Sequence, residues 1–476
     1  KPNDRSNLSY IPALFYPTEP YDESAHKSNS YVSIGSDGTG RMFAENGEVM
    51  EDETVIEFRY DLDAEPGWRW KPIRVRHDKT EDYRRGDRKF GNDYNVANNN
   101  WHSIHTPVTP LMLSTGGDIP DTADDSETYY ATSDLAGRSQ TRGLRDFHNL
   151  FVKRFLVNIA SKSGDTMIDF AVGKGGDIPK WIHGKLSFVY GLDISVDNIE
   201  NKSDGCCARY LNYRTKYHTV PDCIFAHADS GKLIRNGDAF YSDRGGMTND
   251  ALVGKGKKDS SVLGKGVYRM YGRVKDGFDV ASIQFALHYM CKDVVTFHNF
   301  IRNVCENVKN GGYFIATCYD GPSIITKLRN KELGAESALY RNKKKIWGVT
   351  KQYTDESFIP DETSLGKAID VFQETINKVF REYLVHPTYL VETFGHYGFD
   401  LVTSEDMPTA GGGTGLFSEL HRRMLDTTAS DTNIRNYGTA NRMSIEEREI
   451  SFLNRYYILK KNRVVDAKAI YEKLIK

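Results

Sequence analysis

The chain has 476 residues, of which 39% are hydrophobic and 12% aromatic, enough for more than one domain with a packed core. The net charge of −2 excludes a whole-chain attraction to nucleic acid, so any RNA contact must come from local basic patches. A run of about 18 apolar residues, a signal-peptide pattern and a C-x-x-C pair are all absent, so we expect an intracellular protein with reduced cysteines and no zinc site.

The first unit is expected over residues 1–113 and is predicted to be a small β-barrel. Residues 55–60 alternate apolar and polar side chains, and residues 68–76 follow them after a turn, which indicates a hairpin. From Arg74 to Lys89, seven of the sixteen residues are Lys or Arg. This run is typical either of a solvated strand face or of a phosphate-binding patch.

A motif in the hairpin adds a functional expectation for this unit. Residues 70–79 (WKPIRVRHDK) resemble the last conserved motif of mRNA guanylyltransferases. In that family the motif lies on an OB-fold domain that closes over GTP, so the resemblance implies an OB-fold unit here. It implies contacts to GTP or its phosphates at Arg74, Arg76, Asp78 and Lys79.

The rest of a guanylyltransferase is expected upstream of this chain. Lys1-Pro2 is similar to the end of the family's lysine-containing motif, so the nucleotidyl-transfer domain should precede residue 1. The family's catalytic K-x-D-G pattern does occur at residues 202–205 (KSDG). It lies inside a different unit without the surrounding strands, and we interpret it as a chance match.

A linker and a second domain follow. Residues 114–138 are acidic, small and polar without a hydrophobic period, which is typical of a linker. The second domain is expected over residues 139–476. Residues 144–159 carry an apolar stripe at helical spacing, and Asn149 and Lys153 lie one turn apart on that helix.

The second domain is organised around residues 169–181 (DFAVGKGGDIPKW). Residues 166–170 form a short apolar run that indicates a buried strand, and a Gly-rich turn at 173–176 leads into a helix. Glycines let the backbone approach a ligand, and free N–H groups at a helix start face it. The stretch therefore predicts a site for a nucleotide-like ligand.

Polar residues at the ends of the next strands extend this site. The second strand, residues 187–192, ends at Asp193, whose carboxylate is placed to bind both ribose hydroxyls of an adenosine. The third, residues 223–228, ends at Asp229, which can meet an adenine amino group. The fourth spans residues 278–285. The carboxyl ends of parallel strands meet at one sheet edge, so these residues should form one site.

The remaining pattern predicts a mostly parallel, doubly wound sheet with helices on both faces. Residues 235–273 are interpreted as an insertion between the third and fourth strands, because neither of their two Gly-Lys repeats completes a phosphate loop. Further elements are predicted as a helix at 294–308 stopped by Gly311-Gly312, a strand at 313–318, a helix ending near 396–398 and late strands at 399–403 and 452–460.

Adenosine-type binding is compatible with a dehydrogenase or a methyltransferase. The turn lacks the G-x-G-x-x-G that a dinucleotide pyrophosphate requires and carries Lys174 instead, which favours a methyltransferase. The second domain also resembles the cellular and viral mRNA cap guanine-N7 methyltransferases, through GKGGDIPKW, FDVASIQFALHYM, GGYFIATCYDG and EYLV in the family's order. The resemblance implies a class I (Rossmann-like) methyltransferase fold over roughly residues 140–460.

The resemblance also implies which residues bind the cofactor, S-adenosylmethionine. In place of the family's glycine two residues past Asp169, this chain has Ala171. The implied cofactor-binding residues are Lys153, Asp169, Ala171, Gly173, Asp177, Asp193, Asp229, Gln284 and Tyr289.

Cap contacts follow from the same resemblance. His288, Tyr289 and Glu382 are expected to act by positioning, since guanine N7 has a free lone pair and needs neither an acid or base nor a metal. Tyr319 stands where cellular members have a proline. The implied cap-binding residues are Asn149, Lys174, Arg209, Phe285, His288, Glu382 and Tyr457.

The two resemblances together indicate part of a multifunctional mRNA capping enzyme of a large DNA virus. Its expected partners are the capped 5′ end of mRNA, the upstream triphosphatase and guanylyltransferase domains, and a small stimulatory subunit, in the host cytoplasm and the virion, without a membrane. Two alternatives stay open: an inactive methyltransferase-like subunit that stimulates a partner or binds RNA, and a methyltransferase acting on another RNA position.

Overall fold

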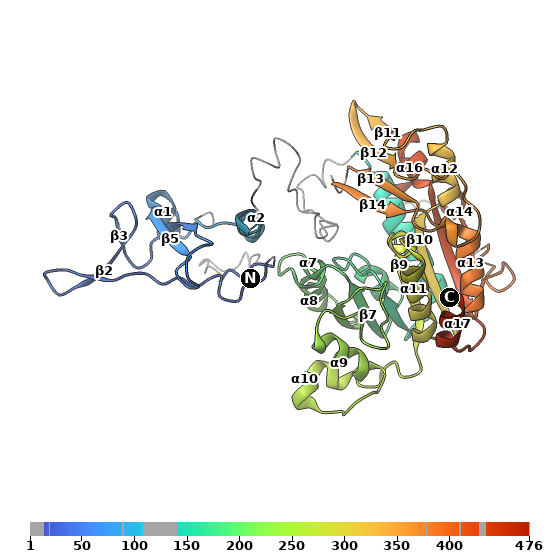
Figure 1. Cartoon of the computed structure of the whole chain (residues 1–476), viewed down its shortest axis with the longest axis horizontal. Helices are drawn as coiled ribbons and strands as arrows, with labels where there is room; N and C mark the ends of the chain where they lie inside the picture. Colours follow the sequence, from blue (N-terminus) through green and yellow to red (C-terminus); the bar gives the residue numbers. More distant parts are fainter. Residues whose placement is uncertain are drawn as a thin grey trace. The chain divides into compact units, whose positions relative to one another are not determined.

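The structure is a computed structural model of the whole chain (Figure 1). The chain divides into two compact units, residues 1–123 and 124–476, each described below by itself. Lys1-Pro2 and the predicted linker at 114–138 lie outside the described residues. The structure describes residues 14–18, 20–87, 90–105, 107, 140–374, 376, 378–408, 411–427 and 435–475.

The first unit contains the predicted hairpin, in which Tyr60 pairs with Trp70. The ring of Trp70 packs on Tyr60, with centroids 4.7 Å apart, and on the buried Trp101. The described strands form two separate sheets rather than the single closed barrel that we expected, because two of them have only two residues each and cannot extend the ladder. The elements are β1 (Ser33–Ile34), β2 (Gly40–Phe43), β3 (Val49–Met50), β4 (Ile56–Tyr60), β5 (Trp70–Val75), α1 (His77–Arg84) and α2 (Tyr94–His105).

The second unit is built on an eight-stranded sheet. Its strands are β6 (Thr166–Asp169), β7 (Phe188–Asp193), β8 (Asp222–His227), β9 (Phe278–Gln284), β10 (Val308–Tyr319), β15 (Phe399–Leu401), β16 (Thr414–Leu416) and β17 (Asn454–Lys461).

The strand order confirms the expected class I methyltransferase fold. The order is β15-β17-β10-β9-β6-β7-β8, and β16 also pairs with β17. The pairs from β8 to β10 are parallel, and β17 runs antiparallel to β10, β15 and β16. Every residue of β6 and β7 is buried, which explains why these strands appear as continuous apolar runs in the sequence.

One predicted boundary is wrong. The helix α11 (Val294–Asn307) ends before Gly311-Gly312, and these glycines lie in the irregular start of β10, where the register with β9 shifts. Gly311 has a φ of +82°, and a Cβ on Gly312 would lie 2.7 Å from the carbonyl oxygen of Asp279. The glycine pair therefore serves an irregular strand entry and not a helix stop.

A second sheet, antiparallel and four-stranded, was not predicted from the sequence. It carries Glu382 in its edge strand and Trp347, which is buried, in an inner strand. Its strands are β11 (Glu336–Arg341), β12 (Lys344–Lys351), β13 (Ala368–Gln373) and β14 (Lys378–Tyr383), in that order.

Helices cover both faces of the eight-stranded sheet, and a separate apolar core lies on each face. The predicted insertion at 235–273 contains two short helices between β8 and β9. The helices are α4 (Arg142–Asp146), the π-helix η3 (Phe147–Val152), α5 (Lys153–Ala160), α6 (Ile178–His183), α7 (Val196–Glu200), α8 (Cys206–Lys216), α9 (Asp243–Leu252), α10 (Ser260–Arg269), η4 (Leu287–Cys291), α11, α12 (Gly321–Leu328), η5 (Glu362–Ser364), α13 (Pro387–His396), α14 (Phe417–Thr427), η6 (Arg435–Tyr437), η7 (Ala440–Arg442), α16 (Ile445–Ser451) and α17 (Ala467–Leu474).

Candidate active site

A cavity of about 380 Å³, the strand-end cavity, lies where β6, β7, β8 and β9 end. Residues from all four strand ends line it, as the sequence predicted. Asp229 accepts a hydrogen bond from the Gly231 N–H at 2.9 Å, which fixes its carboxylate at the wall. The predicted cofactor residues that line this cavity are Lys153, Ala171, Gly173, Asp193, Asp229, Gln284 and Tyr289.

The glycine turn after β6 needs its glycines for two reasons. Gly173 and Gly175 have φ values of +53° and +70°, in the left-handed region that L side chains rarely adopt. A Cβ on Gly175 would also lie 2.9 Å from both Cys206 Sγ and Ile178 Cδ1. The turn can therefore press against α6 and α8 only with glycine at this position.

Asp193 is held by three donors at the end of β7. Its Oδ2 accepts the Gly173 N–H at 2.6 Å, and its Oδ1 accepts the Ser195 N–H and the Asn198 amide, both at 3.0 Å. Burial raises the pKa of this carboxyl group despite these bonds. A carboxylate offers about four acceptor positions, so roughly one remains, on Oδ2. We therefore revise the expected contact from both ribose hydroxyls to one.

Two predicted cofactor residues do not line the strand-end cavity but hold residues that do. Asp169 is buried behind the turn and accepts the Ala171 N–H at 3.1 Å, and burial together with nearby Asp177 raises its pKa to about 7. Burial alone would raise the pKa of Asp177, but Lys153, 3.1 Å away, and Lys180, 2.9 Å away, lower it below its ordinary value. Lys180 also donates to the Gly176 carbonyl.

A second cavity, of about 330 Å³ and here called the Glu382 cavity, adjoins the first. Of the predicted cap residues only Tyr457 lies outside its lining. Tyr457 is fully buried in the core on one face of β17, whereas Asn454, on the opposite face of that strand, lines the cavity. The predicted cap residues that do line it are Asn149, Lys174, Arg209, Phe285, His288 and Glu382.

His288 and Glu382 form a polar pair inside this cavity. Both side chains are about 97% buried, and His288 Nδ1 lies 3.6 Å from Glu382 Oε2. Within the described part of the chain, both ring nitrogens of His288 and Glu382 Oε2 lack a hydrogen-bond partner. Burial lowers the pKa of His288 to about 3 and raises that of Glu382 to about 8. Buried polar atoms without partners are costly, which indicates that a ligand satisfies them.

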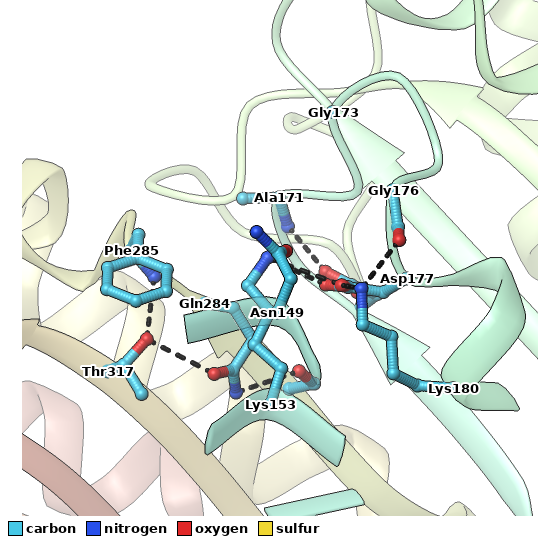
Figure 2. A network of polar contacts seen from close by, with 12 residues as sticks. Asn149, Lys153, Ala171, Gly173, Gly176, Asp177, Lys180, Gln284, Phe285 and Thr317 are labelled. Carbon is cyan, nitrogen blue, oxygen red and sulfur yellow. Dashed lines mark hydrogen bonds and ion pairs between the residues drawn. The ribbon is translucent and has the colours of Figure 1, made fainter. Parts of the chain in front are cut away.

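The two cavities share a wall made of four predicted residues (Figure 2). Phe285 has a φ of +58°, which is strained for an aromatic residue and costs about 1–3 kcal/mol. Its N–H donates to the carbonyl oxygen and the hydroxyl oxygen of Thr317, at 3.0 and 2.9 Å, and Thr317 donates to Gln284. The four shared residues are Lys153, Ala171, Gln284 and Phe285.

Several lining residues were missed by sequence reasoning. The π-helix η3 brings His148 into a stack on Phe285, with ring centroids 5.0 Å apart, and such π turns are frequent at functional sites. The hydroxyl of Tyr319 accepts bonds from Trp347 at 2.9 Å and Gln373 at 3.1 Å. No local pattern signalled these contacts, because the first joins a helix to the segment after β9 and the others join two separate sheets.

The candidate phosphate contacts of the first unit are all ion-paired. Arg74 lies 2.9 Å from Glu57, and Lys79 lies 3.2 Å from Asp82. Arg76 lies 3.0 Å from Asp78 and lowers the pKa of that carboxyl group to about 2. These pairs would have to open before the side chains could bind a phosphate.

The KSDG match lies in the wall behind the Glu382 cavity. Asp204 accepts a bond from Lys174 at 3.0 Å, and a Cβ on Gly205 would clash with the backbone of Asn201 at 2.6 Å. Asp204 and Gly205 thus have structural roles within the methyltransferase-type unit. This agrees with our interpretation of the match.

Comparisons with known proteins show what the second unit resembles. Residues 258–461 match the family model described as the mRNA (guanine-N(7))-methyltransferase domain. This part of the second unit is therefore similar to that family. The capping-enzyme resemblance is likewise confirmed, because the chain is 27% identical to a probable mRNA-capping enzyme of Acanthamoeba polyphaga mimivirus, over 88% of this chain.

The chain also resembles cellular proteins. It is 27% identical to mRNA cap guanine-N(7) methyltransferase 1 of Arabidopsis thaliana, over 39% of this chain. The alignments cover only 37% of the mimivirus protein and 41% of the Arabidopsis protein. The solved structure of the CcbJ methyltransferase from Streptomyces caelestis is 11% identical, with a TM-score of 0.37 over 71% of this chain and 96% of that one.

The described residues contain neither a cluster of metal ligands nor a helix that could span a membrane. His, Cys, Asp and Glu side chains in this part of the chain form no group of three or more that could hold a metal ion. No described helix combines the length and apolar character that crossing a bilayer requires.

Proposed function

We propose that this chain transfers the methyl group of S-adenosylmethionine to N7 of the guanine cap of mRNA, converting GpppN-RNA to m7GpppN-RNA within a multifunctional capping enzyme. The observation that carries this proposal is the pair of adjoining cavities with one common wall. The strand-end cavity has the polar strand ends that suit an adenosine, and the Glu382 cavity holds an unsatisfied pair that suits a guanine.

The guanine fit follows from donor and acceptor chemistry. A Glu382 carboxylate can accept the N1–H and a 2-amino hydrogen of guanine, and a neutral His288 can donate one N–H to O6. These groups are neighbours on the Watson–Crick edge of the base, just as the two side chains are neighbours in the cavity. Adenine has an amino donor in place of O6 and an acceptor in place of N1–H, so in the same pose it could neither accept the His288 N–H nor donate two hydrogens to the Glu382 carboxylate.

The cofactor fit rests on the strand-end cavity. Asp193 would accept a ribose hydroxyl and Asp229 would meet the adenine. Lys153, held by Asp177, would face the carboxylate of the methionine part from the shared wall. S-adenosylmethionine supplies an electrophilic methyl group on a sulfonium.

The reaction requires the chain to position the two reactants, and it requires no proton transfer. Guanine N7 forms the new N–C bond while the C–S bond breaks, so positive charge moves from sulfur to the guanine ring and no proton is transferred. Phe285, fixed by its two bonds to Thr317, and Gln284 would hold the two reactants in line across the common wall. Methylation of a ribose hydroxyl would instead need a base, and the candidate Lys153 is engaged with Asp177.

The test is product identification. The chain is incubated with GpppA-capped RNA and S-adenosylmethionine carrying a labelled methyl group, and the RNA is digested to nucleosides. We expect the label in N7-methylguanosine. Label in a 2′-O-methyl nucleoside would support the alternative RNA position, and no transfer to any RNA would support an inactive stimulatory subunit.

A further inference from the structure

The insertion between β8 and β9 carries a group of basic side chains that the proposed site does not use. Residues 240–277 contain eight Lys and Arg but only four Asp, in a chain whose net charge is −2. All eight basic residues are exposed. We call them the insertion patch, defined as the Lys and Arg side chains of residues 240–277. The patch is a local excess of positive charge on a chain that has none overall.

The cations of the insertion patch have no acidic partners. Within the described part of the chain, none of them lies within 4.0 Å of a carboxylate oxygen. The lysines on either side of the insertion do have partners, because Lys232 lies 3.9 Å from Asp229 and Lys309 pairs with Asp279. Asp259, inside the insertion, is engaged with the first turn of α10, where it accepts two bonds at 2.8 and 2.7 Å. The patch therefore keeps its charge for an external anion.

Helix α10, which carries part of the patch, has no buried residue. Its Val262 and Tyr268 are 63% and 37% exposed. Most protein helices are stabilised by an apolar face packed on a neighbour, and a helix of about ten residues is marginal alone in water. Figure 1 shows α9 and α10 standing out from the rest of the second unit. An uncovered helix with basic and aromatic side chains indicates a surface for a partner.

The loop between α9 and α10 holds three lysines in a defined shape. Gly254 and Gly256 have φ values of +79° and +72°, and the Tyr271 hydroxyl donates to their carbonyl oxygens at 3.0 and 2.6 Å. The Lys258 ammonium lies over the rings of Tyr268 and Tyr271, 5.2 and 5.7 Å from their centroids. The loop carbonyls are thereby turned inward, whereas its three lysines are exposed.

The insertion patch lies at the opposite end of the sheet from the two cavities. Arg273 donates to Ser187 Oγ at 2.9 Å, just before β7 begins, and the Val274 N–H ties this segment to the Leu252 carbonyl at the end of α9. The strand-end cavity lies where the same strands end. The six residues of β7 span roughly 20 Å. A ligand that reaches both places must therefore be an extended polymer.

We propose that the insertion patch binds the single-stranded RNA chain downstream of the cap. This inference rests on the proposed function, since it extends the substrate from the cap to the body of the RNA. An RNA strand repeats a negative charge at every phosphate, and exposed lysines and arginines that neutralise these charges release bound counterions. Exposed Tyr268 offers a ring on which an unpaired base can stack, which favours single-stranded RNA over an acidic protein segment.

The first test measures binding of the full chain to a labelled, uncapped, single-stranded RNA of about 20 nucleotides by fluorescence anisotropy. Lys255→Ala/Lys257→Ala/Lys258→Ala, the loop variant, should raise the Kd at least about tenfold. Its plot of log K against log salt should be less steep by roughly 2, because each lost phosphate contact removes about 0.7. Tyr268→Ala should raise the Kd about threefold or more. The four residues are exposed, so the Tm should stay unchanged, and glutamine replaces alanine if a variant does not fold.

The second test compares GpppA with a capped RNA of about 20 nucleotides as methyl acceptors. GpppA has a single nucleotide beyond the triphosphate and is too short to reach the patch. The loop variant should raise the KM for the capped RNA at least about tenfold and leave the KM for GpppA within about twofold. Lys162→Ala/Lys468→Ala/Lys473→Ala removes the same charge from exposed lysines outside the patch, so it should change neither KM.

The outcomes separate this proposal from the proposed function. If the unmodified chain methylates GpppA but the loop variant binds RNA as tightly as the unmodified chain does, the patch assignment is wrong and the function stands. An equal loss of RNA binding in the control variant, or a loss that affects polyglutamate but not RNA, would also overturn the assignment. If neither GpppA nor capped RNA is methylated while the loop variant alone loses RNA binding, the proposed function is wrong and the patch remains an RNA-binding surface.

Discussion

Replacing Glu382 with glutamine is expected to lower methylation of a guanosine cap at least tenfold, about 1.4 kcal/mol of transition-state stabilisation. Glutamine keeps the size of the side chain but loses the charge and one acceptor, so its amide hydrogens would face the guanine donors. S-adenosylmethionine affinity should stay near normal, because Glu382 lines the other cavity. Steady-state kinetics with GpppA and calorimetry with the cofactor measure the two effects.

An inosine cap provides the matched substrate. Inosine lacks the 2-amino group, so the unmodified chain should use it poorly and Glu382→Gln should discriminate much less between the two caps. Glu382 is not the reader of guanine if the variant still prefers guanosine as strongly as the unmodified chain does.

The raised pKa of Glu382 adds a pH signature. With a pKa of about 8, the buried carboxyl group is largely protonated at pH 7. Only the ionised carboxylate can accept hydrogen bonds from both the N1–H and the 2-amino group of guanine. The KM for GpppA should therefore fall as pH rises from about 6.5 to 8 and then level off. In the unfolded chain this group ionises near its ordinary pKa, so the folded state binds the extra proton and stability falls as pH rises towards 8.

Glu382→Gln removes this titration, so the activity and the stability of the variant can be compared to separate a functional from a structural role. Above pH 7 the variant should be at least as stable as the unmodified chain, with a Tm equal or higher by a few degrees, because no buried carboxyl group remains to be ionised. A variant that loses both Tm and activity would indicate a structural role for Glu382. A KM that does not change between pH 6.5 and 8 would also argue against a carboxylate reader.

Replacing Asp193 is expected to weaken cofactor binding strongly. Asp193→Ala removes the ribose acceptor and also leaves the Gly173 and Ser195 N–H groups and the Asn198 amide without their partner. We expect the Kd for S-adenosylmethionine to rise at least tenfold, since a hydrogen bond to a charged group contributes about 1.5–3 kcal/mol. Calorimetry measures this change directly.

A milder substitution separates the ribose contact from support of the turn. Asp193→Asn keeps the shape and one acceptor oxygen, so it should preserve the fold better than alanine but still weaken cofactor binding. The assignment of Asp193 is wrong if both variants bind S-adenosylmethionine like the unmodified chain. Equal losses of Tm and of cofactor affinity in both variants would indicate that Asp193 supports the glycine turn and does not bind the ribose.

Much of the central sheet could be predicted because its strands leave plain signals. β6 and β7 are buried at every residue and therefore appear as short continuous apolar runs. Since parallel strands end at one sheet edge, Asp193 and Asp229 could be placed in one site from their positions after these runs. The structure puts both in the strand-end cavity.

The rest depends on contacts that no local pattern encodes. Asp169 ends a strand like Asp193, but the chain turns over it, so it supports Ala171 instead of lining the cavity. Lys174 resembles a free anion ligand in the sequence, but two acids that follow it by 23 and 30 residues neutralise it. The surroundings of Glu382 depend on the second sheet, whose packing on Tyr319 joins distant strands.

The central claim is that one cavity holds the cofactor while the other presents guanine N7 to it through their common wall. The most direct test is the structure of the full chain with S-adenosylhomocysteine and GpppA bound together. We expect the adenosine at Asp193 and Asp229, the guanine edge on Glu382 and His288, and N7 directed at the sulfur past Phe285. A guanine bound outside the Glu382 cavity, or with N7 turned away from the sulfur, would contradict it.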